Sequence, residues 1–178
     1  MADRPTPVTG SFRDAESADR AYAAFRERGY SDDEIHVLMS DDTRKRYYDR
    51  EHVEIEKGNK AMEGAGTGAA VGGTIGGIVG AIAALGTTAL IPPLGLTVAG
   101  PLVGALAGAG AGGAAGTLVG GLIGAGIPEQ RAKEYEKDIK DGHIVVGVHP
   151  RDDEDRRYFA ERYNEYGARN VYAGERIA

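Results

Sequence analysis

Histidine is the side chain best suited to metal binding or acid–base catalysis here, because the chain has four histidines and no cysteine. His36 and His143 fall on expected strands, whereas His52 and His149 fall outside them. No two histidines have the i, i+4 spacing that places two ligands on one helix face, and no HExxH motif occurs. We therefore expect strand-edge or surface histidines, with neither a metal site nor a bound cofactor.

Carboxylates occur in three clusters, and paired carboxylates can bind a cation or carry out acid–base catalysis. The clusters lie at residues 32–33, 41–42 and 152–155. Each stands where a helix begins or a turn forms, and acidic side chains there stabilise the positive end of the helix dipole. The glycine-rich part of the chain contains no P-loop motif and no strand-linked GxGxxG with an acid downstream. The sequence thus predicts no enzyme active site.

A basic and aromatic stretch follows the second acidic cluster. Arginine, lysine and tyrosine are favourable at a membrane surface. The candidates for contact with lipid headgroups are Arg44, Lys45, Arg46, Tyr47 and Tyr48. Acidic residues follow at positions 49, 51 and 54, which favours the alternative of a solvated helix face.

Charge divides the chain into three regions. Residues 64–128 contain no Asp, Glu, Lys, Arg or His, whereas the regions before and after them are rich in charge. The formal net charge of −6 argues against nucleic-acid binding, which needs a basic face. No apolar run follows the first residues, so we expect no secretory signal and an N-terminus in the cytosol.

The two charged regions share one order of elements. The first predicts a strand at 8–12, a helix at 15–28 ended by Gly29, and a strand at 35–39. The second predicts a helix at 129–140 with Pro128 in its first turn, a strand at 143–148, a helix at 153–166 and a strand at 170–172. This order predicts an α+β fold, a ferredoxin-like split βαβ sandwich with a long insert.

The domain boundaries follow from these regions. Residues 1–41 form the first βαβ half, 42–63 a charged helical connector, 64–126 the insert, and 127–178 a helix plus the second βαβ half. Because an insert whose ends lie close together leaves the host intact, we expect the insert to protrude.

Glycine recurs in the insert with a period of four, which places it on one face of a helix. The positions are Gly64, Gly68, Gly72, Gly76 and Gly80, then Gly100, Gly104, Gly108, Gly112, Gly116, Gly120 and Gly124. Residues 86–95 between the runs are expected to form a turn, so the insert predicts an antiparallel glycine-zipper helical hairpin. Each glycine costs a helix about 1 kcal/mol, which close backbone contact can offset.

The bulky aliphatic residues of the insert lie mostly away from the glycine face, and we expect them to face outward. No polar face remains, so only lipid or another protein can cover such a surface. Residues 64–85 would span roughly 33 Å as a helix, enough for a bilayer core. The alternatives are a water-soluble oligomer in which hairpins stack, or a flexible low-complexity segment.

Several stretches together resemble the general stress protein 17M-like family of bacteria, over nearly the whole chain. They are VTGSF at 8–12 before an alanine-rich helix, GYSDDEI at 29–35, ALIP at 89–92, AGPL at 99–102, GIPEQRAKEY at 126–135 and GHIVV at 142–146. Residues 42–59 do not match. The resemblance implies a stress-response role and transfers no catalytic residue.

The sequence therefore predicts a non-enzymatic bacterial stress protein at the inner face of the cytoplasmic membrane, with its α+β domain in the cytosol. Its expected partners are membrane lipid and further copies of the chain; nucleic acid is not expected, and no small-molecule substrate is identified. The alternatives are a soluble, cytoplasmic self-assembling protein whose hairpins bundle in an oligomer core, and a small ligand-binding regulatory module.

Overall fold

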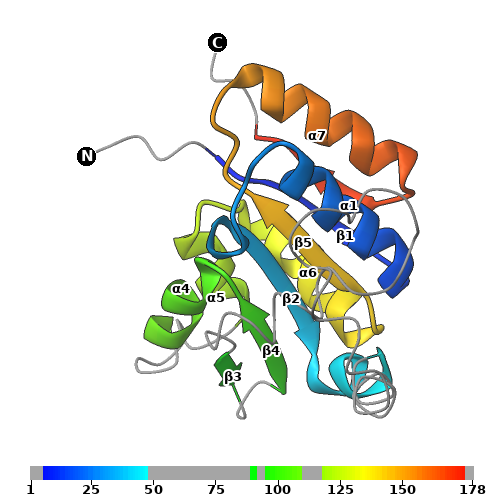
Figure 1. Ribbon diagram of the computed structural model, residues 1–178. Helices are drawn as coiled ribbons and strands as arrows, with labels where there is room; N and C mark the ends of the chain where they lie inside the picture. The colour runs from blue at the N-terminus through cyan, green and yellow to red at the C-terminus, as the bar shows by residue number, and fades with distance from the viewer. Residues whose placement is uncertain (1–5, 48–88, 92–94, 110–117, 175–178) are drawn as a thin grey trace.

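A six-stranded antiparallel sheet forms the centre of the computed structural model, which describes residues 6–47, 89–91, 95–109 and 118–174 (Figure 1). The strand order is β3-β4-β2-β5-β1-β6. The strands are β1 Val8–Phe12, β2 Ile35–Ser40, β3 Ala89–Ile91, β4 Leu96–Ala99, β5 Ile144–Val148 and β6 Arg169–Tyr172. The helices are α1 Ala15–Glu27, α4 Leu102–Ala109, α5 Leu118–Gly124, α6 Glu129–Lys140 and α7 Asp153–Glu165, with a 3₁₀ turn at Asp32–Glu34 and a helical segment at 41–47.

The elements expected in the charged regions are confirmed to within about two residues. Two acidic residues begin helices as expected. Asp14 accepts the Ser17 N–H at 2.8 Å at the start of α1, and Asp152 accepts the Asp155 N–H at 2.8 Å at the start of α7. Gly29 follows α1 with a φ of +81°, a conformation that glycine adopts without strain. Pro128 differs from expectation, since it is the N-cap of α6 and not its first helical residue.

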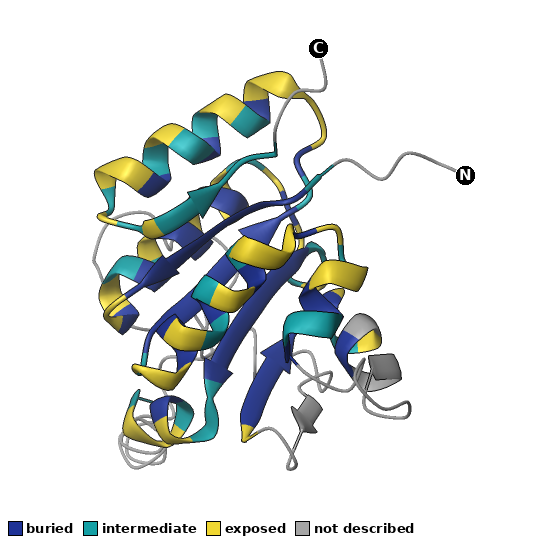
Figure 2. Ribbon diagram, turned by 180° about the vertical axis from the view of Figure 1, so that it is seen from behind, coloured by how far each residue is buried: buried dark blue, intermediate teal, exposed yellow. Residues whose placement is uncertain are grey.

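Two layers of helices cover the two faces of the sheet. Helices α1 and α7 pack on one face, against residues of β2 that include Val37 and Met39. Helices α4, α5 and α6 pack on the other, against Leu38 of β2 and Val145 of β5. Viewed from behind, the strands and the helix sides that face them are buried, while the outer sides of the helices are exposed (Figure 2).

The insert does not form the expected turn and long second helix. Residues 89–91 and 96–99 are strands, and β4 pairs with β2 at the edge of the main sheet. Leu106 of α4 and Gly121 of α5 lie against each other, although one continuous helix would separate them by about 22 Å. Helices α4 and α5 are therefore two separate helices that pack against each other. None of the helices in the described ranges is both long and apolar enough to cross a bilayer.

The leucines of α4 and α5 face the sheet and not the outside, which corrects the expected orientation for these residues, whereas Ile123 of α5 is 44% exposed. Leu102, Leu106, Leu118 and Leu122 are at most 4% exposed. The physical reason is that the second face of the sheet carries the apolar residues Leu38, Val98 and Val145. Apolar side chains must pack on this face to keep it from water. Leucines at i, i+4 spacing on each short helix provide that cover.

Gly104 and Gly124, two glycines of the period-four series, do not lie in the contact between α4 and α5. A Cβ on Gly104 or Gly124 would meet no atom within 4 Å. A Cβ on Gly121, which is outside the series, would overlap the Leu106 side chain and lie 3.0 Å from its Cγ. Gly100 has a φ of +82° and lies against the backbone of Ile35, and Gly120 is half-buried in α5.

The remaining glycines of the series cannot be placed in this way. Gly64, Gly68, Gly72, Gly76, Gly80, Gly112 and Gly116 lie outside the described residues, as do the surroundings of Gly108 and the first helix of the expected hairpin. Self-association through the series stays a prediction.

Alanine at two glycines should change stability in opposite directions. Gly121→Ala should lower the free energy of unfolding by about 1–3 kcal/mol, because the new methyl group overpacks the contact with Leu106. Gly104→Ala should raise it by up to about 1 kcal/mol, because alanine is the better helix former and the space is open. Urea unfolding of both variants measures this difference, and equal effects would contradict the α4–α5 contact.

Candidate functional site

The main pocket of the described structure lies at one end of the sheet and has a volume of about 500 Å³. Because β2 begins where antiparallel β5 ends, residues from both strands meet there. The beginning of α4, the end of α5 and the start of β1 lie at the same end (Figure 1). The lining residues are Thr6, Pro7, His36, Pro101, Leu102, Gly104, Gly124, Ala125, Gly126 and His149. The volume lies within the range of small-molecule sites.

Two histidines that are far apart in the sequence form a pair in this pocket. His36 Nε2 lies 2.9 Å from His149 Nδ1, and the two rings meet edge to face with centroids 4.8 Å apart. The strand register places His36 directly opposite Gly147, and His149 lies one residue beyond the end of β5. A Cβ on Gly147 would overlap the Thr9 side chain and lie 2.9 Å from the Val8 carbonyl oxygen, so the close packing of β1 requires glycine there.

The burial of His36 determines how the pair shares its protons. His36 is 1% exposed, and its Nδ1 is buried without a hydrogen-bond partner among the described residues. A buried N–H without an acceptor is less tolerable than a buried lone pair, so we assign the proton to Nε2, which donates to His149 Nδ1. Burial lowers the pKa of His36 to about 3, with a smaller contribution from His149. His36 is therefore neutral at physiological pH.

The donor set does not suit a metal ion. A histidine that binds a metal through Nε2 normally donates its Nδ1–H to an acceptor, and His36 Nδ1 has none. The described residues contain no group of three or more His, Asp or Glu side chains that could hold a metal. His36 and His149 instead offer hydrogen-bonding groups to the pocket that they line.

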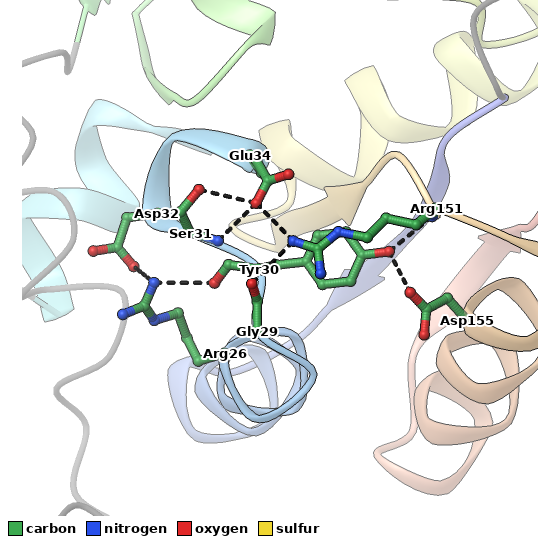
Figure 3. A network of polar contacts seen from close by, with 8 residues as sticks. All are labelled: Arg26, Gly29, Tyr30, Ser31, Asp32, Glu34, Arg151 and Asp155. Carbon is green, nitrogen blue, oxygen red and sulfur yellow. Dashed lines mark hydrogen bonds and ion pairs between the residues drawn. The ribbon is translucent and has the colours of Figure 1, made fainter. Parts of the chain in front are cut away.

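An ion pair holds the two strand ends that carry the histidines (Figure 3). Arg151, two residues after His149, lies 3.1 Å from the carboxylate of Glu34, two residues before His36. Arg151 also donates to the Gly29 carbonyl at 2.9 Å, and its guanidinium lies 4.0 Å from the centre of the Tyr30 ring. These contacts position both histidine-bearing segments relative to each other.

Tyr30 extends the same network to α7. Its hydroxyl donates to Asp155 at 2.6 Å and accepts the Arg151 N–H at 2.8 Å (Figure 3). Burial, and then the hydrogen bond to Asp155, raises the pKa of Tyr30 to about 12, so the phenol keeps its proton. The network therefore joins α1, the segment before β2 and the start of α7.

The expected headgroup residues do not form one surface. Lys45 and Arg46 are exposed, whereas Arg44 is half-buried, 4.0 Å from Asp41. Tyr47 packs against the cluster under α1 and α7, and Tyr48 lies outside the described residues. Arg46 lines a second, smaller pocket together with Ser40, Asp42, Thr43, Lys140, Asp141 and Gly142. Contact of this stretch with lipid stays a prediction.

A buried polar layer lies between β1 and α6. Ser11 Oγ donates to Asp138, and Asn170 donates to the same carboxylate at 2.7 Å. Tyr135 donates to the Asn170 carbonyl at 2.7 Å. Ser11 is completely buried, so its hydroxyl cannot meet a substrate and its role is structural.

The sequence did not predict the histidine pair. It did single out two residues of the pocket lining, but as part of the glycine series. His36 was expected at a strand edge or on the surface, yet it is buried. Gly104 and Gly124 belong to the predicted glycine series, but here they line the pocket. The signal that could have found the pair is the predicted pairing of the strands at 35–39 and 143–148, which brings residues near 36 and 149 together.

Comparison of the chain with protein-family models finds no match, and comparisons with curated proteins and with solved structures find none either. The resemblance to the stress protein family therefore stays a prediction. The function must be argued from the geometry of the pocket.

Replacing His36 should reduce the loss of stability in acid. Its pKa is about 3 when folded and about 6.5 when unfolded, so below pH 6.5 the unfolded chain takes up a proton that the folded chain does not. Wild-type stability therefore falls as pH drops from 6.5 toward 3. Between pH 7 and pH 5 the His36→Gln variant should lose about 2 kcal/mol less than wild type, measured by urea unfolding. Equal losses would contradict a buried neutral His36.

Removing the Tyr30 hydroxyl should destabilise the fold. Tyr30→Phe leaves the Asp155 carboxylate and the Arg151 N–H each without one partner, which costs about 1–3 kcal/mol. Tyr166→Phe, which removes a half-buried hydroxyl outside this network, is the matched control and should cost less. Chemical denaturation compares the two variants, and an equal cost would show that the network adds nothing.

Proposed function

We propose that this protein is a small ligand-binding regulatory module and that the pocket at the His36 end of the sheet is its binding site. The observation that carries this proposal is the pocket of about 500 Å³, whose lining includes the buried His36 and its hydrogen-bonded partner His149. Apolar and backbone surfaces around a few polar groups are typical of small-molecule sites.

The chemistry of the lining favours binding over catalysis. Among the described lining residues, only His36 and His149 have ionisable side chains, and Thr6 provides the one hydroxyl. The described lining contains no carboxylate or thiol, the groups that could act as a nucleophile or take part in acid–base catalysis. His36 is held neutral by its burial, which lets it hydrogen-bond but makes it a poor proton acceptor.

We infer that the host of this site is a ferredoxin-like split βαβ domain. Support comes from the order β6-β1-β5-β2, in which each βαβ unit has a strand of the other between its two strands. The insert contributes β3, β4, α4 and α5, which extend the sheet and cover its second face. The pocket lies where host strands and insert helices meet.

The stress-response role and the membrane hairpin stay predictions. The role in stress depends on the family resemblance alone. The leucines of α4 and α5, which were expected to face lipid, cover the sheet, whereas Ile123 of α5 is exposed. The membrane and self-association proposals therefore depend mainly on residues outside the described ranges, which include most of the glycine series. Fractionation followed by sizing with and without detergent tests them, because a soluble monomer under both conditions would exclude both.

Filling the pocket should abolish ligand binding without unfolding the protein. Gly104→Leu places a side chain into open space at the pocket wall. Thermal-shift screening of a chemically diverse panel of small metabolites should give at least one compound that stabilises wild type and has no effect on Gly104→Leu. Stabilisation follows because a ligand that binds only the folded state shifts the equilibrium toward it.

Ala23→Leu is the matched control, since it adds the same bulk at an exposed position of α1 and should keep the response. A panel without a single stabilising compound, or responses that persist in Gly104→Leu, would refute the proposed site.

A further inference from the structure

His36 lies under the insert helices, on the face of the sheet that they cover. Side chains alternate along β2, where Val37 packs with α1 and α7 and Leu38 packs with α4 and α5, so His36 shares the face of Leu38. The pocket lining agrees, since it joins His36 to residues of both insert helices. A Cβ on Gly100, just before α4, would lie 3.3 Å from the His36 Cα, so the insert backbone packs directly on this histidine.

His36 resists protonation while the helices stay in place. It is 1% exposed, and its Nε2 is hydrogen-bonded to His149, so a second proton would go to Nδ1. That atom is buried without a hydrogen-bond partner among the described residues. Protonation would therefore place a charge, and an N–H without an acceptor, away from water, and both are costly.

The described surroundings of His36 provide no carboxylate to stabilise that cation. His149 faces the ring, and its own positive charge would oppose a second one. Glu34 and Arg151 lie two residues from the histidines along the chain and pair with each other. The described lining from the start of β1, from α4 and from the end of α5 contains no Asp, Glu, Lys or Arg, and the charged side chains of α6 are not among the causes that shift the pKa of His36. Water must therefore solvate a protonated His36, and it reaches the ring when the cover opens.

Helices α4 and α5, which form this cover, are marginal elements. They have eight and seven residues, and isolated helices below about 12–15 residues are marginal in water. Each contains glycine, which costs a helix about 1 kcal/mol per residue.

The packing of the two helix layers differs in the same direction. Leucines hold α4 and α5 on the sheet, whereas α1 and α7 enclose packed aromatic rings that include Phe25, Tyr30 and Phe159. Elements with fewer buried contacts open before the rest of a domain. We therefore expect α4 and α5 to leave the sheet first.

We propose that the His36–His149 pair is an acid-sensitive switch: protonation of His36 releases α4 and α5 from the sheet, while α1, α7 and the host strands stay folded. This inference goes beyond the proposed function, because it requires no ligand. It also goes beyond the loss of global stability in acid, because it concerns the opening of one layer.

The direction and size of the effect follow from the titration of His36. Its pKa is about 3 under the closed helices and about 6.5 once the ring meets water, so opening becomes easier as pH falls from 6.5 toward 3. Between pH 7 and pH 5, the equilibrium constant for opening should rise about 25-fold from His36 alone.

Hydrogen exchange of the full chain at pH 7 and pH 5 tests the switch. Dividing the intrinsic exchange rate at each pH by the measured rate gives a protection factor for each peptide. Protection in α4 and α5 should fall about 25-fold at pH 5. At that pH it should also be about tenfold or more below the protection of α1 and α7, because those helices exchange through larger openings.

Variants at the two histidines separate the titrating group from its partner. His36→Gln has no group that titrates in this range, so the fall in protection should shrink to a few-fold at most. His36→Leu removes the same group without burying a polar side chain, which keeps the test valid where His36→Gln does not fold. His149→Gln is the matched control, since its side-chain oxygen can still accept the His36 N–H, and most of the fall should remain.

The proposal would be overturned by unchanged protection in α4 and α5, by equal protection in both helix layers at pH 5, or by an undiminished fall in the His36 variants. Equal protection would mean that the whole domain opens at once. Thermal-shift screening at neutral pH tests the proposed function separately, so either proposal can fail while the other stands.

Discussion

The antiparallel register between β2 and β5 is the constraint on which the rest of the structure depends. It pairs Ile35 with Val148 and Val37 with Val146 on one face, and it aligns Leu38 with Val145 on the other. Because side chains alternate along a strand, a slip of one residue would exchange the two faces. The slip would also move His36 relative to the end of β5 and so to His149, its hydrogen-bond partner. The ion pair between Glu34 and Arg151 holds the same alignment just beyond the strands.

This register leaves a second apolar face of the sheet that the host helices α1 and α7 do not cover. The insert covers it, with leucines of α4 and α5 packed beside the apolar side of α6. Glycine in the insert then has two different roles. Gly121 permits the close approach of Leu106, whereas Gly104 and Gly124 leave open the space that forms the pocket. The sequence predicted that the glycines would pack helices together. Glycine does so at position 121, but at positions 104 and 124 it leaves a cavity.

Local patterns predicted the charged regions well and the insert poorly. The helix at 15–28 could be predicted because Ala18, Ala21, Tyr22 and Phe25 repeat at helical spacing, and these residues are buried under the sheet. The strands at 89–91 and 96–99 are short and apolar, so their sequence could not be told apart from a turn and the start of a helix. The strand at 96–99 pairs with β2, about 60 residues away, and the strand at 89–91 pairs with β4 in turn, so the free edge of β2 decides their conformation. The histidine pair was missed because its members are 113 residues apart and neither has a local motif.

The position of the pocket couples ligand binding to the packing of the insert helices on the sheet. His36 and His149 belong to the host domain, while Leu102, Gly104 and Gly124 belong to the insert helices. A ligand that contacts both parts stabilises the state in which α4 and α5 are packed on the sheet, by the free energy of its binding to that state. By the same linkage, a change that loosens the insert weakens binding to the same extent. The leucine contacts under α4 and α5 therefore support the fold and the proposed site together.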